Sequence, residues 1–245
     1  MTGDESDWPP DSVGRNAPGS PGWANRLNEL RTLDPSPRRA ELIRLSEGVR
    51  RVLHRLVQTG APLELIAEAA DQVERVAALL AEHHRASIYE GFAESANAGD
   101  PFAFFDHSPM LGKANPLAPP IELWAEGQVM HGRATFDAAY EGPPGCVHGG
   151  YVAAAFDEVL GSAQSFGGQP GMTGRLTVHY RSPTPLRTEL RFAARVVEVT
   201  GRKTFTHGTL HAGERLCAEA EGLFIAIDYG KMLELRAERE RRFPT

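Results

Sequence analysis

Two segments in the first half of the chain have the hydrophobic spacing of amphipathic helices. Leucine and valine side chains repeat at three- and four-residue steps between positions 42 and 56, and a second apolar set does so between 63 and 80. Thr59-Gly60-Ala61-Pro62 separates them, since glycine commonly follows a helix end and proline commonly opens a helix. Residues 37–100 are therefore predicted to form a helical hairpin. Its apolar faces must be buried on the rest of the chain, on a second subunit, or on both.

From residue 101 to about 230 the pattern becomes that of strands around one helix. Partial alternation predicts strands over 121–126 and 129–136, and again over 175–181, 189–199, 203–211 and 216–228. The helix between these groups begins near Gly149 and ends near Gly167, and it is apolar nearly all round. An antiparallel sheet wrapped around a single helix explains this composition. The predicted fold class is α+β.

The two ends of the chain have other patterns. Residues 1–36 are rich in proline and glycine and poor in aliphatic side chains, which predicts a disordered or loosely attached tail. Residues 231–245 include alternating glutamate and arginine, which predicts a charged, solvated helix.

The composition is that of an ordinary globular protein, with 245 residues, 41% of them hydrophobic, and a net charge of -6. An acidic chain without a basic stripe argues against a nucleic-acid partner. No apolar run approaches the ~20 residues of a membrane span, and the acidic start lacks the apolar core of a secretory signal. Cys146 and Cys217 have no metal-ligand spacing and suit a reducing compartment. We expect a cytoplasmic protein with no metal and no membrane span.

Candidate chemistry gathers at the start of the apolar helix. His148 is followed by Gly149 and Gly150, and Asp157 comes nine residues after the histidine, inside the helix. A carboxylate in such a helix is costly to bury unless a partner or a reaction uses it, and burial would raise its pKa and its strength as a base. The alternative is a structural carboxylate that caps or forms an ion pair.

The order of these elements and the segment around His148 resemble the hotdog-fold acyl-CoA thioesterases, and within them the thioesterase-superfamily-member (THEM) and phenylacetyl-CoA thioesterase-like branch. The resemblance rests on residues 141–150, on Asp157, and on residues 115–117, 172–183 and 201–205. It spans roughly residues 105–228, whereas the hairpin has no counterpart in it.

This resemblance implies a hotdog fold and hydrolysis of an acyl-CoA to the free acid and coenzyme A, with no cofactor beyond the coenzyme A of the substrate. Thioester hydrolysis needs a nucleophile or base and hydrogen-bond donors for the developing oxyanion. The resemblance assigns the oxyanion-binding N–H to Gly149, the nucleophile or general base to Asp157, and a helper hydroxyl to Thr173. Gly150 lets the thioester approach the backbone closely, and His148 holds the loop by hydrogen bonding.

Three cations at strand ends are candidate partners of the coenzyme A phosphates, namely Arg181, Arg202 and Lys203. The alternative for each is an ordinary solvated charge. The resemblance favours medium or long fatty acyl chains, and hence fatty acid metabolism, with aromatic acyl groups left open.

The spacing of Gly149 and Asp157 predicts more than one chain in the active site. Eight residues of α-helix extend about 12 Å, whereas reacting atoms must come within about 3 Å of each other. The glycine and the aspartate of one site must therefore come from different subunits. We expect a homodimer or a dimer of dimers.

Some positions depart from related branches of the family. Gly142 stands where related branches have Gln or Asn, and Gly161 stands where branches with a glutamate nucleophile have Ser or Thr. Both are compatible with an aspartate assisted by Thr173. Glu158 points about 100° away from Asp157 around the helix and is interpreted as structural or interfacial.

Other functions stay open at this stage. Cys146 and His148 could form a thiol-based site, although no third orienting residue is evident. A hotdog enoyl-CoA hydratase or dehydratase would have an Asp two residues before Asn-Pro and a His two residues after the proline, where this chain has Lys113 and Ala118. A non-catalytic acyl-CoA-binding protein would not need the acid at position 157. The hairpin is interpreted as a lid or a dimer extension at the acyl end of the site.

Overall fold

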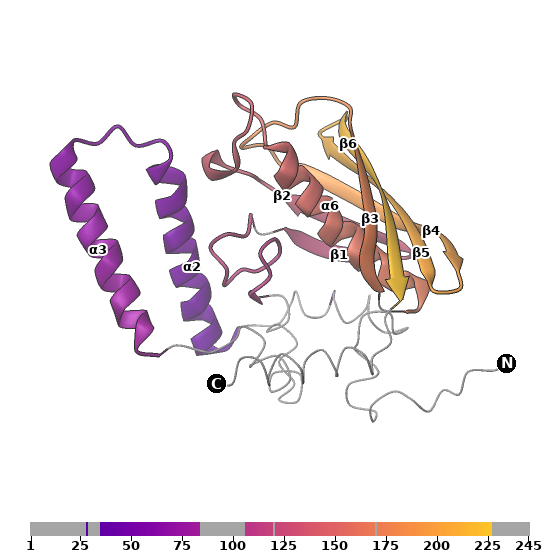
Figure 1. Cartoon of the computed structure of the whole chain (residues 1–245), viewed down its shortest axis with the longest axis horizontal. Helices are drawn as coiled ribbons and strands as arrows, with labels where there is room; N and C mark the ends of the chain where they lie inside the picture. Colours follow the sequence, from indigo (N-terminus) through magenta and orange to yellow (C-terminus); the bar gives the residue numbers. More distant parts are fainter. Residues whose placement is uncertain (1–27, 29–34, 84–105, 120, 170, 227–245) are drawn as a thin grey trace.

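The structure of the protein is a computed structural model that describes residue 28 and residues 35–83, 106–119, 121–169 and 171–226 (Figure 1). The end of the predicted hairpin, most of the predicted tail and the predicted terminal helix over 231–245 lie outside these residues.

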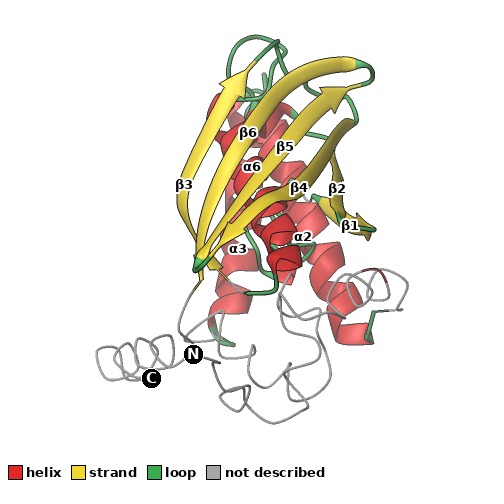
Figure 2. Cartoon of the chain, turned by 90° about the vertical axis from the view of Figure 1, so that its right-hand side faces the viewer, coloured by secondary structure: helices red, strands yellow, loops and turns green. Residues whose placement is uncertain are grey.

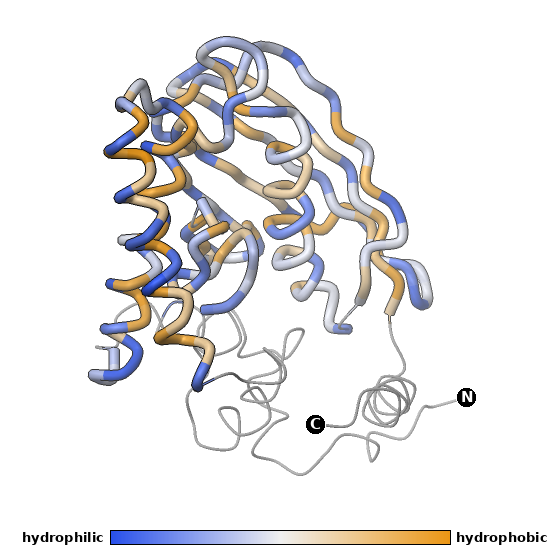
Figure 3. Tube along the Cα trace, turned by 60° about the vertical axis from the view of Figure 1, so that its left-hand side comes forward, coloured by the Kyte–Doolittle hydropathy of each residue, from blue (hydrophilic) through white to orange (hydrophobic). Residues whose placement is uncertain are grey.

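The hairpin helices are α2 (Pro37–Leu56) and α3 (Leu63–Ala81). The hydroxyl of Ser36 accepts a hydrogen bond from the backbone N–H of Arg39, and Pro37 opens the first turn of α2. α3 lies on the far side of α2 from the sheet, and both helices have hydrophobic positions along their length (Figures 1 and 3). Every residue of α3 is exposed, including Leu63 (75%) and Leu79 (72%). The two-helix prediction is confirmed, and the role as lid or dimer extension stays a prediction.

The remaining elements form one six-stranded antiparallel sheet with a helix against it. The strands are β1 (Glu122–Glu126), β2 (Val129–Ala134), β3 (Gly171–Tyr180), β4 (Leu190–Thr200), β5 (Lys203–Ala212) and β6 (Arg215–Ala226). Their order across the sheet is β1-β2-β4-β5-β6-β3, and each neighbouring pair is antiparallel. The short 3₁₀ helix η2 (Ala138–Tyr140) leads toward the central helix α6 (Gly149–Ala163), and η3 (Gln164–Gly167) follows it.

The sheet curves across α6 and encloses its apolar surface (Figure 2). Phe156 and Leu160 of α6 are fully buried, together with Phe192 and Leu210 of the sheet. Gly208 on β5 allows this close approach, because a Cβ there would lie 3.1 Å from a methyl group of Leu160. The predicted hotdog arrangement, with its β-β-α-β-β-β-β order, is confirmed.

The third strand starts earlier than its sequence pattern indicates. β3 begins at Gly171, not at Arg175, and the ladder to β6 shifts register between Thr173 and Arg175. A bulge breaks the two-residue alternation, which is why the pattern hides the first residues of the strand. The earlier start brings Thr173 into the strand. β3 is an edge strand, and most of its residues are exposed.

At the opposite edge, a side chain from the N-terminal segment pairs with β1. The amide of Asn28 donates a 2.9 Å hydrogen bond to the carbonyl of Ala125 and accepts one of 3.1 Å from its N–H. These bonds occupy backbone groups that an edge strand would otherwise present for pairing.

α2 is fixed to the body by its arginines. Arg50 donates to the carbonyl oxygens of Ala118 and Asn115, each at 2.8 Å, and Arg39 forms a bidentate ion pair with Asp106. These contacts join α2 to the segment that precedes β1.

Candidate active site

The N-terminus of α6 is shaped by His148, the residue that caps the helix. Its Nδ1 accepts a 3.0 Å hydrogen bond from the N–H of Gly150, and its carbonyl accepts from the N–H groups of Tyr151 and Val152. Three of the first four N–H groups are thereby occupied. The remaining N–H, that of the first residue Gly149, donates no hydrogen bond to any part of the chain that the structure describes.

Gly149 therefore presents the kind of donor that an anion at a helix N-terminus would use. Its own carbonyl accepts a 2.8 Å hydrogen bond from the hydroxyl of Tyr180, the last residue of β3. A Cβ at Gly149 would come within 3.3 Å of that hydroxyl, so the tyrosine packs closely on the glycine. The sequence assigned the donor to Gly149 and missed Tyr180, although it lies within the matching residues 172–183.

Asp157 lies two turns further along α6, facing the start of β3. The hydroxyl of Thr173 donates a 2.8 Å hydrogen bond to its Oδ1. The side chain of Asp157 is half-buried, and Thr173 is exposed. The structure thus brings together the carboxylate and the hydroxyl that the sequence grouped in one site. Gly149 is at the N-terminus of the same helix, eight residues before Asp157.

The neighbouring carboxylate, Glu158, is hydrogen-bonded to a residue of the segment that precedes β1. Ser108 donates a 3.2 Å hydrogen bond to its Oε1. Although Glu158 as a whole is of intermediate exposure, its carboxyl lies deep enough for burial to raise its pKa, an effect that the charge of Asp157 reinforces and the bond from Ser108 opposes. The interpretation of Glu158 as structural or interfacial stays a prediction.

The three candidate phosphate-binding cations lie in two places. Arg181 directly follows β3 at its Tyr180 end and is paired with Glu219 at 2.7 Å. Arg202 and Lys203 lie at the turn between β4 and β5, where Arg202 donates to the carbonyl of Ala226. Ala226 is the ladder partner of Gly171, so this turn is near the Thr173 end of β3.

The surroundings of Gly142 and Gly161 show how much room each position has for a side chain. A Cβ at Gly142 would lie only 2.7 Å from the Cα of His148, so the loop that carries the histidine leaves no room for a side chain there. At Gly161 a Cβ would make an ordinary contact of 3.6 Å with Phe224.

The thiol alternative receives no support from the contacts around the two cysteines. Cys217 is buried beside the carbonyl oxygens of Pro183 and Arg215, and Cys146 is partly buried. Nδ1 of His148 is occupied by Gly150, and Cys146 has no hydrogen bond to this imidazole within the described ranges. Within these ranges, no group of three or more His, Cys, Asp or Glu side chains is placed to hold a metal ion. None of the described helices has both the length and the hydrophobicity of a membrane span.

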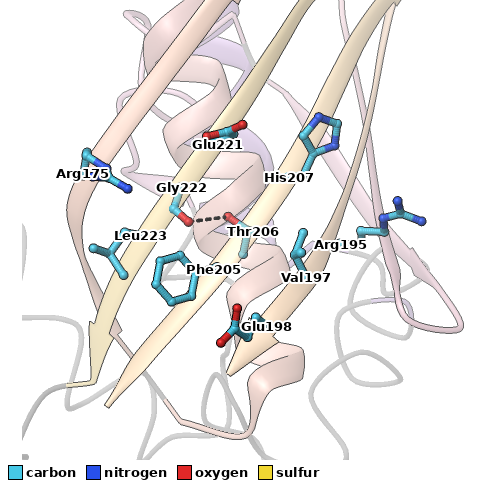
Figure 4. A pocket seen from close by; sticks show the side chains of 10 residues that line it. All are labelled: Arg175, Arg195, Val197, Glu198, Phe205, Thr206, His207, Glu221, Gly222 and Leu223. Atoms are coloured by element: carbon cyan, nitrogen blue, oxygen red, sulfur yellow. Dashed lines mark hydrogen bonds between the residues drawn. The ribbon is translucent and has the colours of Figure 1, made fainter. Parts of the chain in front are cut away.

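A hollow of about 440 Å³ lies elsewhere, on the face of the sheet that is turned away from α6 (Figure 4). Arg175, Arg195, His207 and Glu221 line it, around the apolar side chain of Phe205. Asp157 and Gly149 do not line this hollow. The helix-facing residues and the outer hollow are therefore separate features of the chain.

Comparisons with known proteins agree with this arrangement. A family model described as Thioesterase superfamily matches residues 144–219, a range that includes His148, Asp157 and Thr173. The acyl-coenzyme A thioesterase THEM4 of Xenopus laevis is 37% identical over 89 residues, which cover 36% of this chain and 40% of the relative. THEM4 of Mus musculus is 34% identical over 95 residues, or 38% of this chain and 41% of the relative.

The chain thus spans about 40% of the length of these curated relatives. A solved structure described as a thioesterase superfamily protein matches over much more of the chain. It is 33% identical, covers 75% of this chain and 94% of its own, and has a TM-score of 0.65.

Proposed function

Because this chain belongs to the thioesterase superfamily, we propose that it hydrolyses the thioester bond of an acyl-coenzyme A. The observation that carries the proposal is the 2.8 Å hydrogen bond from Thr173 to Asp157 of α6. The same helix starts with the N–H of Gly149, which donates no hydrogen bond to the described residues. A held carboxylate and a helix N-terminus supply the two groups that hydrolysis requires.

In this proposal Asp157 acts either as general base or as nucleophile. As a base, it takes a proton from water while the water oxygen bonds to the thioester carbonyl carbon. The oxyanion that forms is stabilised by the N–H of Gly149. Collapse of this intermediate breaks the C–S bond, and the coenzyme A thiolate leaves and is protonated. Thr173 orients the carboxylate, and no metal or redox cofactor is needed for these steps.

Two subunits share each site in this proposal. Gly149 and Asp157 are eight residues apart on one continuous helix, which separates them by about 12 Å. The exposed edge of β3 supports pairing with a second copy, since such an edge presents unpaired backbone groups. A two-fold axis near the middle of β3 would run the two edge strands antiparallel and bring the Thr173 end of one strand toward the Tyr180 end of its partner.

That pairing supports a composite site, because Tyr180 binds the carbonyl of Gly149 in its own chain. The partner's Gly149 would then be carried toward Asp157 and Thr173, and the same exchange would occur on the other side of the axis. The functional unit is therefore a homodimer, or a dimer of dimers built from it.

The cations at the β4–β5 turn are proposed to bind the coenzyme A phosphates. Arg202 and Lys203 are exposed and lie near the Thr173 end of β3, whereas Arg181 is already paired with Glu219. The acyl group is proposed to be a medium or long fatty chain, with an aromatic acyl group as the competing choice. Two unpaired cysteines are in keeping with a cytoplasmic location.

The test is a panel of acyl-CoA thioesters assayed for thiol release with the full-length chain, its Asp157→Asn variant and a Glu158→Gln control. We expect turnover with at least one acyl class, a loss of roughly 10²- to 10⁴-fold in Asp157→Asn, and little change in Glu158→Gln. Turnover equal in the wild type and Asp157→Asn would refute the proposal. Tight binding of acyl-CoA with no turnover would favour the non-catalytic alternative, and hydration of an enoyl-CoA would favour the hydratase.

A further inference from the structure

The hairpin helix α2 contacts the segment that leads into α6. The contact is made by His54, which lies outside the residues 144–219 that match the family model. Nδ1 of His54, in the last turn of α2, accepts a 3.1 Å hydrogen bond from the backbone N–H of Ala139 in η2. Its ring also meets that of Tyr140 edge-on, with 5.4 Å between the centroids. α2 therefore holds η2 by one directional bond and one ring contact.

Tyr140 carries this contact to the helix N-terminus. It is 4% exposed, its hydroxyl donates a 2.9 Å hydrogen bond to the carbonyl of Leu117, and its ring packs at 4.9 Å on that of Tyr151. Its carbonyl accepts a 2.8 Å hydrogen bond from the N–H of His148. One peptide further is the Gly149 N–H. A displacement of η2 would therefore move the cap of α6.

A second clamp holds η2 from the other side. Asp137, which caps η2 through Ala138, pairs with Arg187 at 2.6 Å. Arg187 also donates a 2.9 Å hydrogen bond to Gln58, just beyond the end of α2. The end of α2 is thus linked to η2 directly through His54 and indirectly through Gln58, Arg187 and Asp137.

We propose that His54 is a positioning residue for the oxyanion-binding N–H of Gly149, acting through Tyr140 and His148. The inference rests on the proposed thioesterase function. It gives the hairpin a role that neither a lid nor a dimer extension describes. The imidazole fits this role only while neutral, since a protonated Nδ1 is a donor and cannot accept the N–H of Ala139.

The surroundings of His54 favour that neutral form. Burial lowers the pKa of its imidazole, the nearby Arg50 and Arg187 act in the same direction, and Asp137 opposes them. The acceptor is therefore available at neutral pH. On acidification the bond to Ala139 is lost, and a cation is added between two guanidinium groups.

The decisive pair of variants is His54→Ala and His54→Asn. The side-chain oxygen of asparagine can occupy the position of Nδ1 and accept the same hydrogen bond, but it does not titrate. We expect His54→Ala to lower kcat about tenfold with little change in KM, and His54→Asn to restore most of it. As pH falls through the lowered pKa of His54, kcat of the wild type should fall relative to His54→Asn. His83→Ala, at an exposed histidine beyond α3, serves as the control.

Hydrogen exchange of the segment 138–152 supplies a readout that does not need activity. Faster exchange in His54→Ala, reversed in His54→Asn, supports the positioning role even if no acyl-CoA is turned over, in which case only the proposed function fails. The inference is overturned if folded His54→Ala keeps wild-type kcat and exchange. It is also overturned if His54→Asn fails to restore kcat while both variants lose thermal stability equally.

Discussion

The hydroxyl of Thr173 and the carboxylate of Asp157 lie 2.8 Å apart, joining the edge strand β3 to the middle of α6. The bond engages Oδ1, and no hydrogen bond to Oδ2 occurs within the residues that the structure describes. One carboxylate oxygen is therefore held while the other is available to a water molecule or a carbonyl carbon. In the proposed hydrolysis, this arrangement would set the direction of attack before the substrate binds.

Thr173→Val should test this orientation, because valine has nearly the same shape without the hydroxyl. A hydrogen bond to a charged group contributes about 1.5–3 kcal/mol, so kcat should fall about tenfold to hundredfold. Thr173→Ser keeps the donor and should retain most of the activity. Steady-state kinetics on the preferred acyl-CoA measures both. Equal activity in the valine and serine variants would mean that the hydroxyl does not orient the carboxylate.

Glu158→Gln should change how the stability of the protein depends on pH. Because burial raises the pKa of Glu158 in the folded state, its favourable contribution to stability is present below its unfolded pKa of about 4.3 and is lost as pH rises through the folded pKa. The glutamine variant should therefore match or exceed the wild-type melting temperature at pH 7 and lose this advantage near pH 4. Thermal denaturation across this range is the measurement. If the wild type instead gains stability relative to the variant as pH rises, the pKa of Glu158 is not raised by folding.

Gly142→Ala should disturb the histidine loop. The new Cβ would lie 2.7 Å from the Cα of His148, and a backbone atom cannot move away without shifting the cap of α6. We expect a loss of about 1–3 kcal/mol in the free energy of unfolding, together with reduced kcat. Gly60→Ala is the control, since nothing lies within 4 Å of a Cβ at that position. An unchanged Gly142→Ala enzyme would show that this loop has no bearing on the chemistry.

Sequence alone identified the groups that belong to one continuous segment or one matching motif. The apolar surface of α6 and the grouping of Asp157 with Thr173 follow from local spacing or from the family pattern, whereas the helix cap made by His148 emerged only from the structure. The bulge at Thr173 hid the start of β3, because a register shift interrupts the alternation on which strand prediction depends. Contacts between distant segments, such as His54 with Ala139, 85 residues apart, leave no periodic signal at all.

The surroundings of the two carboxylates of α6, Asp157 and Glu158, could not be predicted from the sequence either. Sequence suggested a costly acid at Asp157 and gave no sign that burial raises the pKa of Glu158, one residue later. Ser108, which covers Glu158, comes from a loop 50 residues earlier in the chain. Only the folded arrangement reveals that Ser108 contacts Glu158.

Lys203→Ala should test the assignment of the β4–β5 turn to the coenzyme A phosphates. An exposed ion pair contributes at most about 1 kcal/mol, so KM for acyl-CoA should rise about threefold to fivefold at low salt and less at high salt. KM for the corresponding pantetheine thioester, which lacks the nucleotide phosphates, should not change. Arg181→Ala should have the smaller effect, since Glu219 already neutralises this guanidinium. Equal increases for both thioesters would locate Lys203 away from the phosphates.

The central claim is that Gly149 of one subunit and Asp157 of another form one thioesterase site. Two variants remove one group each: Asp157→Asn, and Gly149→Pro, which deletes the N–H at the first helical position. Gly149→Ala keeps the N–H and controls for the Cβ that proline places 3.3 Å from the Tyr180 hydroxyl. The backbone of His148, with φ -60° and ψ 132°, already has the extended conformation that precedes proline. Asp157→Asn and Gly149→Pro should each be inactive alone.

The most direct measurement is the acyl-CoA hydrolysis rate of the mixed dimer, purified with a different affinity tag on each variant subunit. If the site combines two chains, one of its two sites contains both an intact Gly149 and an intact Asp157. The mixed dimer should then recover about half of the wild-type kcat per dimer. A mixed dimer that is as inactive as its parents, or a fully active wild-type monomer in sedimentation, would contradict the two-subunit site.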